Sequence, residues 1–128
     1  MNKPLVHILR IFLGSVFLIA GINGYFVILG LEPFIETSPQ AMELFQFQYL
    51  LIFEKSLEII CAVLLLSNRY VPLALALLSP ILANIFLLHL FKDHSLLALA
   101  AVLVFVHGAL LFYYRRNYVS LFEKKLRP

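Results

Sequence analysis

Three charged side chains interrupt a hydrophobic run near the middle of the sequence. The run "FEKSLEIICAVLLL" covers residues 53–66, and its charged members are Glu54, Lys55 and Glu58. On a helix, Glu54 and Glu58 share one face at a spacing of four residues, and Lys55 reaches Glu58 at the i, i+3 spacing. Carboxyl groups shielded from water can exchange protons or bind a polar group. The alternative is structural: Lys55 pairs with Glu58, and the stripe holds neighbouring helices together.

The composition indicates that this stripe lies in a lipid environment. Hydrophobic residues make up 62% of the 128 residues and charged residues only 13%, whereas a soluble domain is about a quarter charged. A charged residue at the centre of a membrane span costs roughly 2.5 to 3.5 kcal/mol on insertion scales. Three charges in one helix therefore need a partner, water or neutralisation, and we expect them to face the interior of a bundle.

Four segments are long and apolar enough to cross a bilayer as helices, since a ~30 Å hydrocarbon core needs roughly 20 residues. These segments cover residues 7–31, 48–67, 71–91 and 95–115. The short second and third loops make neighbouring helices antiparallel. Ser38 and Pro39 predict a short interfacial helix over residues 39–47. The sequence therefore predicts one all-α integral membrane domain over residues 1–128, a four-helix up-down-up-down bundle.

The distribution of basic residues predicts the orientation of this bundle. With four spans, both termini and the second loop share one side of the membrane, and Lys92 alone is basic in the other two loops. The first side holds Lys3, Arg10, Arg69, Arg115, Arg116, Lys124, Lys125 and Arg127. The positive-inside rule then places both termini in the cytoplasm. The net charge of +3 is interpreted as an insertion signal and as contact with anionic lipid head groups, not as nucleic-acid binding.

Other polar side chains fall at the depth of the charged stripe. At ~1.5 Å of rise per residue, Asn23 and Asn84 lie level with Glu58, and His89 lies level with Glu54. Asn84 and His89 differ by about 140° around their helix, so an ideal helix cannot aim both inward, and we prefer Asn84. The predicted polar cavity in the outer half of the bundle consists of Asn23, Glu54, Lys55, Glu58, Asn84 and His89.

No complete catalytic or metal-binding motif accompanies this cavity. Cys61 is the single cysteine, which excludes an intrachain disulfide and favours a packing role. His89 and His107 lie at different depths, and no second ligand stands at metal-binding spacing from either one. The residues themselves therefore imply no metal and no cofactor, and leave open whether the protein is an enzyme.

The first span carries a stripe of small residues. Gly14 and Gly21 are seven residues apart, and Ala20 and Gly24 lie nearby. Small residues allow the backbones of two membrane helices to approach closely. This stripe therefore predicts close helix packing rather than a phosphate-binding loop.

Two stretches resemble the DoxX-like family of small bacterial membrane proteins. The stretch "LRIFLGSVFLIAGING" (residues 9–24) is similar to the family's opening helix, with an arginine, a glycine and a second glycine seven residues later. The stretch "LLLSNRYVPLALALLSPILANIFLLHLF" (residues 64–91) is closer still. With Glu58 and the Tyr-Tyr-Arg end of the fourth span, the resemblance covers nearly the whole chain.

The resemblance implies a four-helix protein of the bacterial inner membrane. The family takes its name from subunits of a thiosulfate:quinone oxidoreductase, some relatives are linked to oxidative-stress complexes, and distant ones act as membrane-protein assembly factors. One hypothesis is therefore the membrane subunit of a quinone-linked or oxidative-stress redox system, with a quinone head group in the cavity and a soluble redox partner. The other is a non-enzymatic scaffold or assembly factor that binds membrane proteins. A homodimer that transports a small solute is a third possibility.

Overall fold

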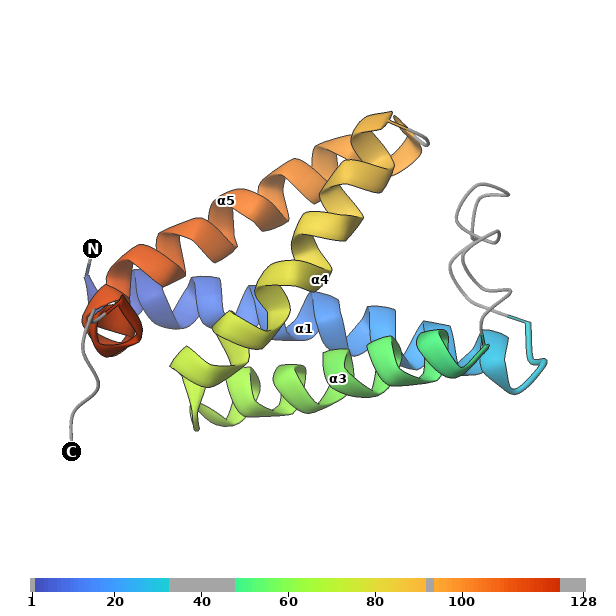
Figure 1. Cartoon of the computed structure of the whole chain (residues 1–128), viewed down its shortest axis with the longest axis horizontal. Coiled ribbons are helices and arrows are strands. Elements are labelled where there is room, and N and C mark those ends of the chain that lie inside the picture. The colour runs from blue at the N-terminus through green and yellow to red at the C-terminus, as the bar shows by residue number, and fades with distance from the viewer. Residues whose placement is uncertain (1, 33–47, 92–93, 123–128) are drawn as a thin grey trace.

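The computed structural model describes residues 2–32, 48–91 and 94–122, and nearly all of them are helical (Figure 1). The predicted interfacial helix over residues 39–47 lies outside these ranges. The elements are α1 (Lys3–Ile28), α3 (Gln48–Ser67), α4 (Val71–Phe91), η1 (His94–Leu96), α5 (Leu97–Tyr113) and η2 (Arg115–Phe122). The bounds of α3 and α4 are those predicted. α1 begins before residue 7 because the Asn2 side chain accepts a hydrogen bond from the Leu5 amide and caps the helix.

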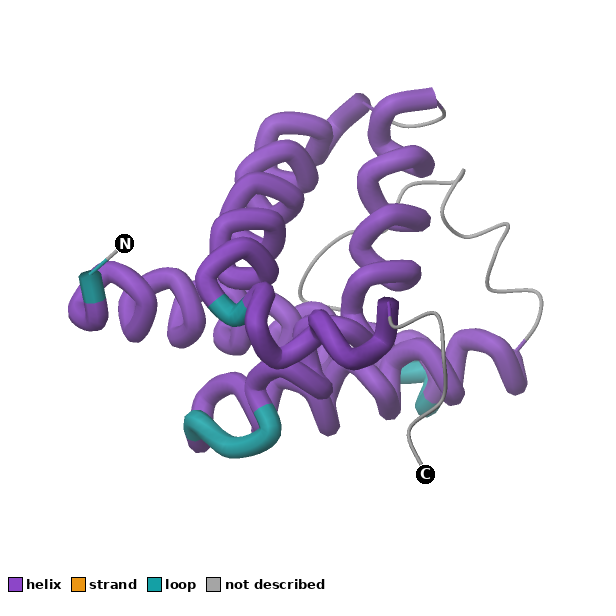
Figure 2. Tube along the Cα trace, turned by 60° about the vertical axis from the view of Figure 1, so that its left-hand side comes forward, coloured by secondary structure: helices purple, strands orange, loops and turns teal. Residues whose placement is uncertain are grey.

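The long helices form two antiparallel hairpins, α1 with α3 and α4 with α5. α1 packs most extensively against α3, α4 packs against α5, and smaller contacts join α3 to α4 and α1 to α5. The hairpins cross rather than run parallel, and they diverge toward the connection between α4 and α5 (Figures 1 and 2). Side chains at the level of this divergence therefore lie farther apart across the bundle than those near the chain termini.

Apolar side chains fill the contact between the hairpins and also cover the outside. Leu13 and Phe17 of α1, Leu65 of α3 and Leu75 of α4 are almost fully buried. By contrast, large apolar residues are exposed on every long helix, and Phe105 of α5 is 82% exposed. Exposed apolar surface of this extent, without a polar face, matches a lipid environment.

Within the described residues, two helices are long and apolar enough to cross a membrane by themselves, α1 and α4. α5 has 17 residues and qualifies as a third only together with η2, from which it is bent by 75°. α3 has 20 residues but contains the charged stripe. Whether α3 can cross a membrane therefore depends on how its charged side chains are paired or shielded from lipid.

The turn between α3 and α4 ends α3 as predicted. Asn68 adopts a left-handed conformation with φ 58°, which Asn tolerates better than most residues. The Arg69 amide donates to the Leu64 carbonyl at 3.0 Å, and the Asn68 amide to the Leu65 carbonyl at 3.3 Å. These are the two hydrogen bonds of a Schellman motif, so the tight turn predicted at Asn68 is confirmed.

Arg10 of α1 stabilises the same end of α3. Its guanidinium is buried and donates to the carbonyls of Leu65 and Leu66, in the last turn of α3. His7, one turn earlier on α1, lies 3.0 Å from the guanidinium through Nδ1. A cation at a helix C-terminus interacts favourably with the helix dipole. The sequence predicts Arg10 on the cytoplasmic side but does not predict this contact, in which Arg10 joins α1 to the end of α3.

His107 links the second hairpin. It is buried in α5, and its Nε2 lies 2.9 Å from the Leu75 carbonyl and 3.3 Å from the Ser79 hydroxyl, both of α4. A carbonyl only accepts, so Nε2 carries the proton in this contact. His107 therefore connects α4 to α5.

Candidate functional site

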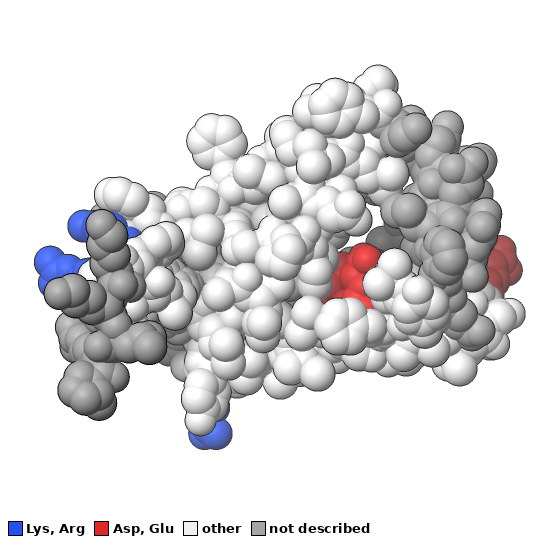
Figure 3. Space-filling model, viewed as in Figure 1, with Lys and Arg blue, Asp and Glu red and all other residues white. Residues whose placement is uncertain are grey.

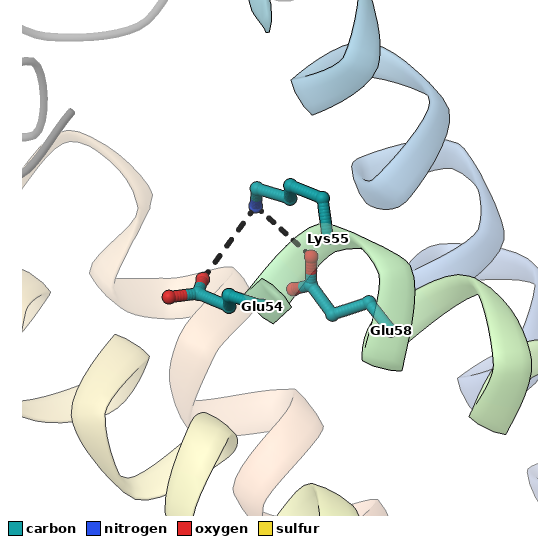
Figure 4. Close-up of polar contacts among 3 residues, drawn as sticks. All are labelled: Glu54, Lys55 and Glu58. Atoms are coloured by element: carbon teal, nitrogen blue, oxygen red, sulfur yellow. Dashed lines mark ion pairs between the residues drawn. The ribbon is translucent and has the colours of Figure 1, made fainter. Parts of the chain in front are cut away.

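The charged stripe of α3 forms a compact cluster on the inner side of that helix. The Lys55 ammonium lies 3.0 Å from Glu58 Oε2 and 3.7 Å from Glu54 Oε1 (Figure 4). The Glu58 side chain is fully buried, while those of Lys55 and Glu54 are 13% and 30% exposed. Helical spacing allows a Lys55–Glu58 pair but leaves open whether it forms, and in the structure the two side chains are paired.

The cluster carries more negative than positive charge. One ammonium is shared between two carboxylates, and an ionised pair in a water-poor site needs further hydrogen bonds to offset its desolvation. Oε1 of Glu58 is buried and has no hydrogen-bond donor among the described residues. A carboxylate oxygen in this position can accept a hydrogen bond from a hydroxyl group, or it can take up a proton.

The cluster is open to the outside through Glu54 and, to a smaller extent, Lys55. Figure 3 shows acidic atoms at the surface beside uncharged residues, in the half of the molecule opposite most of the visible basic residues. Glu54 and Lys55 are partly exposed, so a ligand can reach them, whereas Glu58 is fully buried.

α1 positions Lys55 through the absence of a side chain at Gly24. A Cβ on Gly24 would overlap Cγ, Cδ and Cε of Lys55, and one on Gly21 would lie 2.5 Å from Ile59 Cγ1. A Cβ on Gly14 would lie 3.0 Å from Leu66 Cγ. The small-residue stripe of α1 therefore packs against α3 as predicted, and Gly24 leaves room for the lysine.

A second contact between α1 and α3 was not predicted. It is a hydrogen bond that joins the hydroxyls of Tyr25 and Ser56.

The other predicted cavity residues differ in burial. Asn84 of α4 is exposed, and no hydrogen bond joins it to Glu58. His89 is partly buried near the end of α4. Asn23 is buried on α1. Two residues at the same depth in a membrane are neighbours only if their helices run side by side. Because the two hairpins diverge, the outer part of α4 lies away from α3 (Figure 1).

Cys61 has the packing role expected for it. Its side chain is fully buried in the apolar core beside Ala62, one turn below Glu58. Among the described residues, no three His, Cys, Asp or Glu side chains come together as metal ligands.

These features define an all-helical membrane protein, in which apolar helices enclose one buried ion-pair cluster. Comparison with protein families identifies it more closely, because the DoxX family model matches residues 5–91, which cover most of α1 and all of α3 and α4. The chain belongs to the DoxX family. Comparisons with curated proteins and with solved structures give no match.

Proposed function

We propose that the chain crosses the bacterial inner membrane four times, through α1, α3, α4 and α5, with both termini in the cytoplasm. The charge distribution supports this arrangement. Arg69, Arg115 and Arg116 lie at the end that holds the α3–α4 turn and η2, whereas the described acidic residues lie in the other half. α3 crosses as a fourth span because Glu58 is buried and paired with Lys55.

Single-cysteine labelling tests this topology. In a Cys61→Ala background, Tyr49→Cys at the start of α3 and Ser120→Cys in η2 place one exposed thiol at each end of the bundle. A membrane-impermeant maleimide added to intact spheroplasts should label position 49 and leave position 120 unlabelled until the membrane is permeabilised. The reverse pattern, or equal labelling before permeabilisation, contradicts the topology.

Within this topology, we infer that the protein is the membrane subunit of a quinone-linked redox system. The observation that carries this inference is Oε1 of the fully buried Glu58, which has no hydrogen-bond donor among the described residues and lies next to the partly exposed Glu54 and Lys55. A quinol hydroxyl is a hydrogen-bond donor of the kind that this oxygen lacks. The lysine ammonium donates to a quinone carbonyl, and the apolar side chains around the cluster suit the ring and its tail. A soluble partner supplies the electron transfer.

Substitution of Glu58 by glutamine tests the quinone site while preserving side-chain volume. Quinone extracted from the purified protein should fall by at least about tenfold, because a hydrogen bond to a charged group contributes about 1.5–3 kcal/mol. Ser67→Ala, at the other end of α3 and exposed, is the matched control and should retain the quinone. Parent protein that carries no quinone, or a Glu58→Gln variant that retains it with unchanged quinone-linked oxidation in membranes, contradicts the site.

The second candidate function is a non-enzymatic scaffold or assembly factor. The glycine stripe of α1 is used within the chain, so a partner helix or a second copy would need another surface. α5 supplies one at Gly108, where a Cβ would meet nothing within 4 Å, beside the exposed Phe105. Stoichiometric crosslinking of another membrane protein to Gly108→Cys, with quinone absent from the parent protein, favours this function over the first.

A further inference from the structure

The last described helix turns away from the hydrophobic bundle. η2 begins two residues after the end of α5 and is bent from it by 75°. In Figure 1, η2 is viewed end-on while α5 runs across the picture. When α5 crosses a bilayer, a bend of this size directs η2 along the membrane surface.

A hydrogen bond fixes η2 against the start of α4. The Tyr118 hydroxyl donates to the Pro72 carbonyl at 2.7 Å. Burial raises the pKa of Tyr118 above its ordinary value, and the neighbouring Tyr114 raises it further. The hydroxyl therefore keeps its proton and remains a donor at neutral pH, which holds η2 in a defined place beside the bundle.

The free side of η2 combines apolar and basic side chains. Val119, Leu121 and Phe122 are 61%, 73% and 84% exposed. In a 3₁₀ helix of three residues per turn, Arg116, Val119 and Phe122 form one row, and Asn117 and Ser120 form a separate polar row. This segregation gives the helix an apolar side, with arginines at its beginning.

Basic residues surround η2. Arg115 lies over the Phe112 ring, 4.3 Å from its centre, and donates to the Phe112 carbonyl at the end of α5. Arg116 is exposed, and Arg69 lies in the turn just before α4. The described acidic residues lie far from η2: Glu32 follows the end of α1, and Glu54 and Glu58 belong to the first half of α3, away from the α3–α4 turn. The surface around η2 therefore combines positively charged side chains with exposed apolar side chains.

We propose that η2 lies in the head-group layer of the bilayer and binds anionic phospholipids. Val119, Leu121 and Phe122 enter the boundary between head groups and acyl chains, while Arg115 and Arg116 pair with lipid phosphates. Apolar side chains beside arginines on a helix parallel to the membrane are the pattern of interfacial helices. Each arginine near an anionic membrane surface should raise the affinity of η2 for that surface about fivefold. This inference is independent of the quinone site.

A tryptophan reporter tests the position of η2, because the chain contains no tryptophan. Phe122→Trp in the full chain is reconstituted into nanodiscs of phosphatidylcholine with increasing fractions of phosphatidylglycerol. With phosphatidylglycerol present, the emission should move to shorter wavelength, and brominated lipid should quench it more than acrylamide does. Arg115→Gln with Arg116→Gln in the same reporter should need a severalfold higher fraction of phosphatidylglycerol for the same change.

Phe105→Trp in α5 is the matched control, since that side chain lies on the lipid-facing side of a span. Its emission should be quenched by brominated lipid at every lipid composition. Acrylamide quenching of the Phe122→Trp reporter in all nanodiscs overturns the proposal, because η2 then lies in water. The proposal is also overturned if the Phe122→Trp reporter is protected from acrylamide to the same extent at every fraction of phosphatidylglycerol. It is overturned as well if η2 crosslinks to another polypeptide that accounts for the protection.

Discussion

Replacement of Lys55 by methionine should destabilise the protein by about 3–5 kcal/mol, the cost of removing one partner from a buried ion pair. Methionine nearly preserves the length of the side chain that lies over Gly24, so packing against α1 changes little. The main effect is electrostatic. Glu58 remains fully buried, and the ammonium that lay 3.0 Å from it is lost. Unfolding by SDS in mixed micelles measures the difference in free energy.

A double variant separates the ion pair from packing. Replacing Glu58 by methionine as well removes the buried charge, so the double variant Lys55→Met, Glu58→Met should recover most of the lost stability. Glu58→Met alone should cost less than Lys55→Met, because Lys55 still lies beside the partly exposed Glu54. A Lys55→Met variant within about 0.5 kcal/mol of the parent, the ordinary range of surface substitutions, shows that the pair does not stabilise the fold.

Alanine at Gly21 should lower the free energy of unfolding by about 1–3 kcal/mol, the usual cost of overpacking a core. A Cβ at this position lies 2.5 Å from Ile59 Cγ1 and 3.3 Å from the Lys55 carbonyl oxygen. The backbone contact cannot be relieved by a change of rotamer, so α1 and α3 must separate. This separation also displaces Lys55, and quinone content should fall along with stability.

Gly108 provides the matched control for Gly21. A Cβ there meets nothing within 4 Å, so Gly108→Ala should stabilise α5 by about 0.5–1 kcal/mol through lower backbone entropy in the unfolded chain. Both substitutions replace a helical glycine by alanine, and they differ only in their surroundings. Equal effects at the two positions would show that helix propensity, rather than the approach of α1 to α3, determines the result.

Local features of this protein are readable from the sequence because they depend on residues close together in the chain. The i, i+3 spacing brings Lys55 to Glu58 on any helix, and the predicted ends of α3 and α4 agree with the structure. Asn68 ends α3 because it accepts a positive φ. The hydrophobic composition indicates lipid before any contact is known.

The remaining features depend on how the hairpins pack. Arg10 donates to the last carbonyls of α3, and His107 contacts the Leu75 carbonyl. These partners are far apart in the sequence, so no local sequence pattern predicts the contacts. Asn84 shares the predicted depth of Glu58 but is exposed, because the two hairpins diverge (Figure 1). The sequence alone determines the helices, their environment and the charged face of α3. The crossing of the hairpins follows from the summed packing of many side chains, so only the tertiary structure decides which polar groups from different helices meet.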